Sequence, residues 1–438
     1  MMNIYSVAEA KDTILKRKAY KRIEYSPITV KKTEEIFGRG VRPHQAVETI
    51  LESVEHEGDQ AIRKWSRILD HYDGVEIVIP ASKLEQAWIN LPDGIKDAMQ
   101  IATDRIKTFH KKQTIFSWIE DDMGGQLGQQ FKPIDRVGVY VPGGTAPLPS
   151  SLLMSVIPAQ VAGVKQIFVA TPPEPDLSIL AAAYLCQVED VYQIGGAQSI
   201  AALAFGTETV QKVDKIVGAG NLYVTLAKQQ LFGIVGIEGL AGPTETMVIA
   251  DQTAKPAWVA ADLLAQAEHD VQASAILLTP DLEFAQAVRD EVLTQSKSLS
   301  RKDIILASLE NRGGIVVTES LNQAAELANA YAAEHLCLSV DQPEKLMERI
   351  NNAGGFFLGE YSFEVLGDYV AGPSHIMPTG GTARFASPLN VLDFVKISSV
   401  IGLDTATAKE LSEIAADLAD LEHLTAHASA ARARVEDK

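Results

Sequence analysis

The stretch 136–144, RVGVYVPGG, is followed by QIFVATPP at 166–173 and VYQIGG at 191–196. Each segment starts as a short β-rich run and ends in glycine or proline, which is typical of a buried strand that leads into a turn. The next segment, 197–206 (AQSIAALAFG), is rich in small apolar residues and is typical of a helix. This alternation of strand, turn and helix predicts βαβ units and a parallel sheet.

A second stretch with the same alternation begins near Thr246. Alanine-rich, helix-like segments at 254–270 and 320–334 separate its strand-like runs. These runs are 247–251 (MVIAD), 275–280 (AILLTP), 314–320 (GIVVTES) and 335–340 (HLCLSV). The chain is therefore predicted to be an α/β protein with two Rossmann-like units. We expect ligands in the crevice between them, at the carboxyl ends of the strands.

The remaining regions are predicted to be helical. Residues 1–130 are charge-rich, and their apolar residues recur at helical intervals, as in Val47, Ile50, Leu51 and Val54. We expect this region to pack on a first α/β unit at 131–245 and a second at 246–388. Residues 389–438 are expected to form a helical tail.

The tail has one apolar stripe that requires a partner. Its members, at three- and four-residue spacing, are Leu411, Ile414, Leu418 and Leu421. Such a helix docks either on its own chain or on a second subunit, and the spacing favours neither.

Composition excludes several classes of protein. Of the 438 residues, 46% are hydrophobic and 22% are charged, which is typical of a globular protein and excludes a disordered one. The net charge of −18 disfavours nucleic-acid binding. Two cysteines are too few for a disulfide framework. The N-terminal residues carry scattered charges and lack the apolar region of a signal peptide, and no apolar run reaches the length of a membrane helix. We expect a cytoplasmic protein without a membrane partner.

The glycine clusters by themselves do not decide whether the chain binds a dinucleotide. The dinucleotide motif G-x-G-x-x-G is absent, because Tyr223 stands where Gly218 and Gly220 would require a third glycine. Two other clusters, 141–145 (VPGGT) and 195–198 (GGAQ), follow predicted strands. Glycine there allows a ligand to approach the backbone, but it also makes an ordinary tight turn, and the spacing alone favours the turn.

Two pairs of polar residues are candidates for chemistry. Gln266 and His269 are three apart on a predicted helix, so they share a face and suit a metal ion, although a solvated helix end has the same pattern. Glu334 and His335 lie where a helix gives way to a strand. A carboxylate beside an imidazole suits acid–base catalysis, but a helix-end ion pair is the simpler interpretation.

Other candidates are weaker by themselves. Asp368 lies in a turn-rich loop, 367–375, where an aspartate usually caps its own backbone. Glu422 and His427 are five apart, about 140° around an unbroken helix, so they converge only if the helix breaks near Thr425. Cys186 and Cys337, weighed as nucleophiles, have the apolar neighbours of buried small hydrophobic residues.

Taken together, these segments resemble the histidinol dehydrogenase family over nearly the whole chain from about Arg136. The segments that carry the resemblance are 136–164 (RVGVYVPGGTAPLPSSLLMSVIPAQVAGV), 194–228 (IGGAQSIAALAFGTETVQKVDKIVGAGNLYVTLAK), 241–245 (AGPTE), 259–270 (VAADLLAQAEHD), 332–336 (AAEHL), 367–375 (GDYVAGPSH) and 378–385 (PTGGTARF). The family implies a homodimer with shared active sites, one zinc ion per subunit and NAD. It also implies oxidation of L-histidinol through L-histidinaldehyde to L-histidine, the last step of histidine biosynthesis.

The resemblance also assigns roles to residues. Glu334 and His335 match the catalytic pair. The positions that match zinc ligands are Gln266, His269, Asp368 and, donated from the partner subunit, His427. The NAD contacts would be Tyr140, Gln198 and Asn221. The substrate contacts would be Thr244, Glu422 and His335, together with the four metal-binding residues.

The sequence departs from the family pattern at a few positions. Thr244 stands where the family commonly has serine, Ser374 where it has asparagine and Ala219 where it has proline. The segment 233–243 (GIVGIEGLAGP) is also less typical. Two alternatives remain: a family relative that oxidises another small polar alcohol, such as a sulfonated diol, and a non-enzymatic zinc-binding protein.

Overall fold

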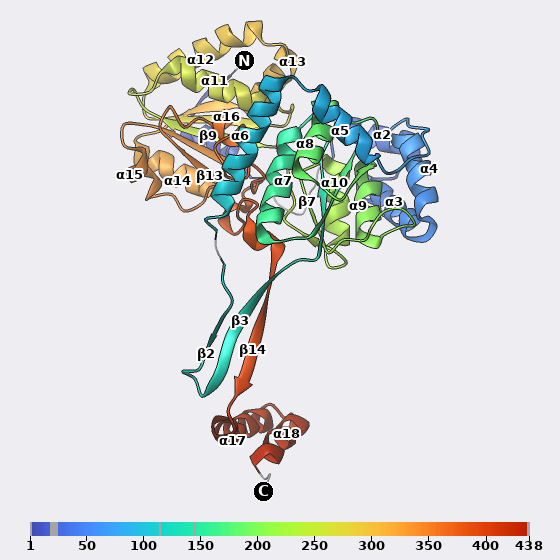
Figure 1. Cartoon of the computed structure of the whole chain (residues 1–438). Coiled ribbons are helices and arrows are strands. Elements are labelled where there is room, and N and C mark those ends of the chain that lie inside the picture. The colour runs from blue at the N-terminus through green and yellow to red at the C-terminus, as the bar shows by residue number, and fades with distance from the viewer. Residues whose placement is uncertain (1, 18–24, 114, 144–145, 436–438) are drawn as a thin grey trace. The chain divides into compact units, whose positions relative to one another are not determined.

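A computed structural model describes residues 2–17, 25–113, 115–143 and 146–435 (Figure 1). Contacts divide the chain into two compact units. The first contains Met1–Lys112 and Asp135–Phe394, and the second contains Gln113–Ile134 and Val395–Lys438. Within the described residues, no helix combines the length and apolar character required to span a bilayer.

The first sheet is parallel, with strand order β6-β5-β4-β7-β8. Its strands are β4 (Arg136–Tyr140), β5 (Gln166–Thr171), β6 (Asp190–Gln193), β7 (Lys215–Val217) and β8 (Gly236–Ile237). The helices between them are α7 (Pro149–Ala162), α8 (Leu177–Cys186), α9 (Gly196–Phe205) and α10 (Leu222–Leu231). The stretch that opens at Arg136 therefore forms the predicted βαβ units.

The second sheet is also parallel, with strand order β1-β11-β10-β9-β12-β13. Its strands are β1 (Ile4–Ser6), β9 (Glu245–Ala250), β10 (Ser274–Thr279), β11 (Gly314–Val317), β12 (His335–Ser339) and β13 (Gly355–Leu358). Its helices and 3₁₀ turns are α11 (Pro256–Ala267), α12 (Leu282–Gln295), η1 (Ser296–Ser298), α13 (Lys302–Asn311), α14 (Leu321–Tyr331), α15 (Pro343–Met347), α16 (Glu364–Tyr369) and η2 (Thr382–Arg384). The following 3₁₀ turn, η3 (Val391–Phe394), packs instead against α7 of the first α/β unit. The predicted α/β class with two Rossmann-like units is confirmed.

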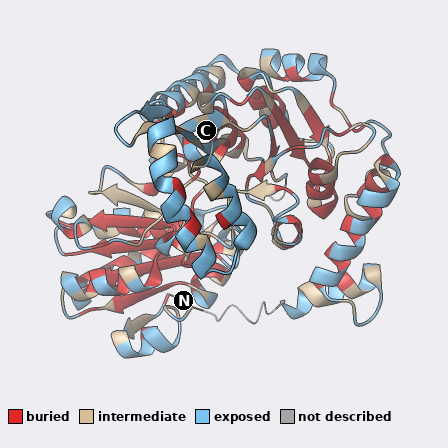
Figure 2. Ribbon diagram, turned by 90° about the horizontal axis from the view of Figure 1, so that it is seen from below, coloured by how far each residue is buried: buried red, intermediate tan, exposed pale blue. Residues whose placement is uncertain are grey.

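Side chains alternate across the second sheet and fill a core on each face. On β9, Val248 and Ala250 join a cluster with α11 and α12, whereas Met247 and Ile249 join a cluster with α14. Strands buried on both faces need the continuous apolar runs that the sequence has. Figure 2 shows this buried interior in red, beneath helices whose outer faces are exposed.

The N-terminal region is mainly helical, as expected, but it also contains strands. Its helices are α1 (Val7–Asp12), α2 (Pro27–Phe37), α3 (Pro43–Glu57), α4 (Asp59–Leu69), α5 (Ala81–Asn90) and α6 (Asp93–His110). The periodic residues of α3 are buried against the first α/β unit. β1 instead extends the edge of the second sheet beside β11. A three-residue strand is too short for its periodicity to be detected in the sequence.

The second unit combines an antiparallel sheet with two helices. The strand order is β14-β3-β2, with β2 (Trp118–Glu120), β3 (Gly125–Pro133) and β14 (Val395–Leu403). The helices are α17 (Thr405–Leu421) and α18 (Thr425–Val435). The tail predicted at 389–438 thus contains a 3₁₀ turn and a strand before its helices, which the sequence analysis did not predict, and its helix breaks between Leu421 and Thr425. The division of the chain at residues 130, 245 and 388 stays a prediction.

Candidate active site

His335 is the first residue of β12 and lies among three carboxylates. Its Nδ1 is 3.8 Å from Glu334 and 3.9 Å from Glu364, and its Nε2 is 3.6 Å from Asp368. Within the described residues, neither ring nitrogen has a hydrogen-bond partner, although the side chain is buried. Both nitrogens are therefore free to exchange a proton with a ligand.

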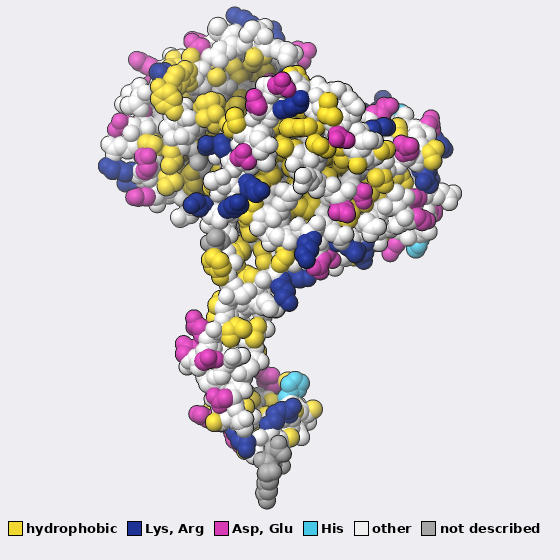
Figure 3. Space-filling model, viewed as in Figure 1, with side chains coloured by type: hydrophobic (Ala, Val, Ile, Leu, Met, Phe, Trp, Pro, Cys, Tyr) yellow, Lys and Arg dark blue, Asp and Glu magenta, His cyan; other side chains and the backbone are white. Residues whose placement is uncertain are grey.

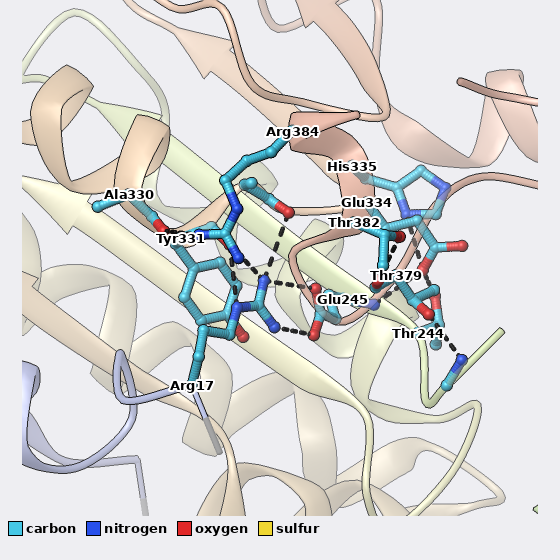
Figure 4. Close-up of polar contacts among 12 residues, drawn as sticks. Arg17, Thr244, Glu245, Ala330, Tyr331, Glu334, His335, Thr379, Thr382 and Arg384 are labelled. Carbon is cyan, nitrogen blue, oxygen red and sulfur yellow. Dashed lines mark hydrogen bonds and ion pairs between the residues drawn. The ribbon is translucent and has the colours of Figure 1, made fainter. Parts of the chain in front are cut away.

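The start of β9 holds the neighbouring carboxylates in place (Figure 4). Thr244 Oγ1 and the Glu245 backbone N–H donate to the same oxygen of Glu334, at 2.5 and 2.9 Å. Thr246 Oγ1 donates to Glu364. Because side chains alternate along a strand, Thr244 and Thr246 lie on the same face, and strand pairing places His335 opposite Thr246. The register of β9 and β12 thus sets the geometry of the acids around the imidazole.

Burial and charge shift the proton affinities of this cluster in opposite directions. Burial alone would lower the pKa of His335, but the carboxylates of Glu364, Glu334 and Asp368 outweigh it and raise that pKa to about 10. Burial raises the pKa of Glu334 above its ordinary value and that of Glu364 to about 7. Neighbouring titratable side chains whose pKa values are shifted this far are typical of sites that perform acid–base chemistry.

Potential metal donors are Asp368 and His269, whose charges interact with that of His335, and Gln266, which lies three residues before His269. Gln266, on α11, is fully buried, and within the described residues neither its amide nitrogen nor its amide oxygen has a hydrogen-bond partner. His269 follows the end of α11, and burial lowers its pKa even though the nearby Asp368 carboxylate opposes the shift. A buried amide without partners is costly unless a ligand satisfies it. An amide oxygen, an imidazole and a carboxylate are donors that suit zinc.

The tail residues of the predicted site belong to the other compact unit. Glu422 and His427 flank the break between α17 and α18, whereas the cluster around His335 belongs to the first unit. Among the described residues, no three His, Cys, Asp or Glu side chains form a complete metal-binding group. The candidate donors in the first unit are His269, Asp368 and Gln266, and the last of these is an amide rather than a His, Cys, Asp or Glu side chain.

The three predicted dinucleotide contacts lie at the carboxyl end of the first sheet. Tyr140 ends β4, and its hydroxyl accepts a hydrogen bond from the Gly196 N–H at 3.3 Å. Gln198 Nε2 donates to Asp70 at 3.0 Å, while its buried Oε1 has no partner among the described residues. Asn221 caps α10 by accepting from the N–H groups of Tyr223 and Val224.

Glycines allow these loops to approach one another. A Cβ at Gly218, where φ is +110°, would lie 2.1 Å from the Tyr140 carbonyl oxygen, and one at Gly220 would lie 3.0 Å from the Tyr140 ring. Only glycine fits such a backbone angle and approach. The cluster at 141–145 is only partly visible, because Gly144 and Thr145 lie outside the described residues.

The position of the acid–base cluster corrects one expectation. The sequence analysis placed ligands at the carboxyl ends of the strands, and the candidate residues of the first sheet, Tyr140, Gln198 and Asn221, lie at that end. In the second sheet, however, Thr244 and Glu334 precede β9 and β12, and His335 begins β12, so the cluster lies at the amino end. The rule for ligand crevices applies to one open sheet, and it does not decide which edge a second sheet turns toward a site.

Sequence analysis missed three residues that the structure brings into these sites. Glu364 is four residues before Asp368 on α16, a spacing that could have indicated a shared face. His375 was noticed only as part of its loop, and its Nδ1 is 2.8 Å from the Asp368 carbonyl oxygen. Asp70 follows α4 and has no motif around it. Cys186 and Cys337 are buried, as predicted, and burial raises the pKa of both thiols.

Comparisons with known proteins agree on one family. A family model described as histidinol dehydrogenase matches residues 39–435. The chain is 47% identical to the histidinol dehydrogenase of Nitrosospira multiformis over 401 residues, which cover 90% of this chain and 91% of the relative. It is 45% identical to that of Deinococcus radiodurans over 440 residues, covering 99% and 100%. The crystal structure of histidinol dehydrogenase from Elizabethkingia anophelis aligns with a TM-score of 0.90 at 34% identity, covering 99% and 98%.

The proton affinity of Asp70 gives a testable pH dependence. Burial raises the pKa of Asp70 from 3.8 to about 6, although the hydrogen bond from Gln198 opposes the shift. The folded state therefore binds this proton more tightly than the unfolded state. The contribution of Asp70 to stability is greatest below about pH 4 and is lost as the pH rises to about 6.

We expect Asp70→Asn to lack this decline. Between pH 4 and pH 6, the melting temperature of Asp70→Asn should rise relative to that of wild type as the pH increases. Asp73→Asn is the control, because it removes a nearby exposed carboxylate that pairs with Arg67 at 2.6 Å. A constant difference in melting temperature between wild type and Asp70→Asn would contradict the expected proton affinity.

Proposed function

The chain belongs to the histidinol dehydrogenase family of oxidoreductases, and we propose on this basis that it oxidises L-histidinol to L-histidine through L-histidinaldehyde, with NAD⁺ as the oxidant. This reaction would be the last step of histidine biosynthesis. The observation that supports it best is the buried imidazole of His335, whose two free nitrogens lie among carboxylates.

In this proposal His335 moves the protons of both oxidations. Its Nε2 faces Asp368 and the donor set, so it is suited to take the proton of the substrate hydroxyl. Its Nδ1 faces Glu334 and Glu364, the nearest carboxylates to which the imidazolium would pass its proton before it accepts one from the substrate. Glu334, held by Thr244, would then activate the water that hydrates the aldehyde.

We propose that Tyr140, Gln198 and Asn221 contact NAD⁺. The free Oε1 of Gln198 is an acceptor for a hydroxyl or amide donor of the dinucleotide, and its amide is oriented by Asp70. The cofactor supplies the hydride acceptor. The glycines around Tyr140 replace the missing dinucleotide motif, because they let a ligand approach the backbone without a clash.

We propose that Gln266, His269 and Asp368 hold a zinc ion, with His427 of the partner subunit as the fourth ligand. The buried, unpaired amide of Gln266 supports this assignment. When bound, zinc would anchor the imidazole and amine nitrogens of the substrate. Thr244, His335 and Glu422 would complete the contacts with the substrate.

Product stoichiometry tests the overall reaction. Purified protein with zinc, histidinol and excess NAD⁺ should form two NADH for each histidine, as measured by absorbance and amino-acid analysis. Thr244 adds a methyl group beside Glu334, so other small polar alcohols, including a sulfonated diol, form the comparison panel. If histidinol is not turned over while another alcohol is, the chain is a family relative with a different substrate. Either absence of histidinol turnover or turnover of none of these alcohols would contradict the proposed function.

Gln266→Met separates zinc binding from folding. Methionine has a similar length but no amide, so it removes a metal donor and also removes an unpaired buried polar group. We expect chelator-treated variant to be at least as stable as chelator-treated wild type, by up to about 3 kcal/mol. Zinc affinity, measured by competition with a chromogenic chelator, should fall by about tenfold or more. Unchanged zinc affinity would refute the role of Gln266.

We also propose that the protein is a homodimer in which the tail completes the partner's site. Apolar side chains along α17 are exposed, namely Leu411, Ile414, Leu418 and Leu421, and Figure 3 shows further hydrophobic side chains on the surface of the second unit. Such a stripe requires a partner surface.

Subunit mixing tests the shared site. His335→Ala and His427→Ala should each be inactive alone, because each lacks one essential group at every site. Heterodimers formed after subunit exchange should contain one intact site and regain part of the activity. Exchange is confirmed by separating differently tagged dimers. Confirmed heterodimers without activity would argue against donation of His427 across the dimer.

A further inference from the structure

The N-terminal segment brings Arg17 against the turn that precedes the acid–base pair (Figure 4). Its Nε and Nη2 both donate to the Tyr331 carbonyl oxygen, at 3.0 and 2.5 Å. Its guanidinium also forms a two-pronged ion pair with Glu245, with Nη2 at 2.8 Å from one oxygen and Nη1 bonded to the other. The guanidinium carbon lies 3.6 Å from the centre of the Tyr331 ring. Every nitrogen of the side chain is therefore engaged.

Glu245 connects this arginine to Glu334. The Glu245 side chain alternates with those of Thr244 and Thr246, so it faces away from His335 while its backbone N–H donates to Glu334. The residue is only 6% exposed, and among the described residues Arg17 is the cation that pairs with its carboxylate, so removing Arg17 would leave a buried charge. Burial raises the pKa of Glu334, and the negative charge of Glu245 adds to that effect.

The other contact of Arg17 is with the chain that leads into β12. Tyr331 is the last residue of α14, and the helix ends through Ala332, whose φ is +52°. Glu334 follows two residues later. The final carbonyls of a helix have no partners inside it, and a cation there also interacts favourably with the helix dipole. Arg17 thus binds the start of β9 and the turn before β12 at once.

We propose that Arg17 is a positioning residue for the acid–base pair. It contacts both the start of β9 and the turn before β12, the two segments that position Thr244, Glu334 and His335. It also neutralises the charge of Glu245 on the opposite face of the sheet. The proposal rests on the proposed roles of Glu334 and His335. It also gives the N-terminal segment a role at the site, although Arg17 and Glu245 are 228 positions apart in the sequence.

Charge removal in two steps tests the proposal. Arg17→Met keeps an apolar stem but leaves Glu245 unpaired, whereas Arg17→Met/Glu245→Gln also removes the stranded charge. We expect the single variant to lose between about tenfold and about 100-fold in kcat, with smaller changes in KM. The double variant should recover much of that loss, because a neutral amide is tolerated where an unpaired carboxylate is not.

Two further variants separate charge from geometry. Arg17→Lys keeps the positive charge but lacks the planar fork that reaches Glu245 and Tyr331 together, so its kcat should be intermediate. Arg384→Met is the matched control. Arg384 donates to the Ala330 carbonyl oxygen at 3.4 Å, at the same end of α14, and its loss should leave kcat close to that of wild type.

Melting temperatures of all variants provide a readout that does not depend on turnover. Arg17→Met should melt below both wild type and the double variant. A folded Arg17→Met enzyme with wild-type kcat, or a double variant no better than the single one in both kcat and melting temperature, would overturn the proposal. If Arg17→Met does not fold, the kcat of Arg17→Lys decides: a wild-type value would overturn the proposal. Absence of histidinol turnover by wild type would instead contradict the proposed function, and the melting comparison would still test the pairing of Arg17 with Glu245.

Discussion

The candidate site depends on a buried imidazole held among carboxylates that cannot be solvated freely. Removing charges from water is costly, and the cost is offset only when each group has fixed, well-directed partners. Three consecutive residues supply these partners: Thr244 and the N–H of Glu245 bind Glu334, and Thr246 binds Glu364. Three residues at the start of one central strand thus hold two of the three carboxylates around His335 in fixed positions.

This dependence explains why the cluster lies where two strands begin. β9 and β12 are neighbours in the middle of a parallel sheet that is buried on both faces, so their relative register cannot slip without exposing apolar residues. The fixed register therefore also fixes the relative positions of the residues at the start of the two strands. The face of the sheet that carries His335 also packs against α11, which carries Gln266, while the opposite face packs against α14 and Tyr331. One face of the sheet therefore carries the candidate donor groups, and the opposite face carries the residues that hold the strands in position.

Local pattern was sufficient to predict the class of the fold. Strand-like runs bounded by glycine and proline predicted βαβ units, and the structure forms them with boundaries that differ by a few residues. The same method failed for β1 and for β14. β1 is too short to have a period, and β14 pairs with the distant β3 rather than with a neighbour in sequence. Pairing over such separations leaves no local signal.

The candidate site was predictable to the extent that it resembles a family, and much less from the residues alone. Gln266 with His269, and Glu334 with His335, were visible as pairs, but helix ends have the same patterns. Glu364 and Arg17 escaped notice because their roles arise from contacts between segments far apart in the chain. The choice of sheet edge escaped for a related reason, since it is a property of how elements pack and not of any one element.

The departures from the family pattern can now be weighed by what each side chain touches. Thr244 uses its hydroxyl to hold Glu334, a contact that serine would make equally well, so the substitution preserves the hydrogen bond and adds only a methyl group. Ser374 is buried and donates to the Met154 carbonyl oxygen on α7, which makes it a packing contact at the loop after Asp368. Ala219 lies between two glycines near Tyr140, in the loop that follows β7 of the first sheet. None of the three removes a proton-transferring group or a donor beside His335. The residues proposed for acid–base chemistry are therefore retained, and of the three substitutions only that at Thr244 changes the volume beside Glu334.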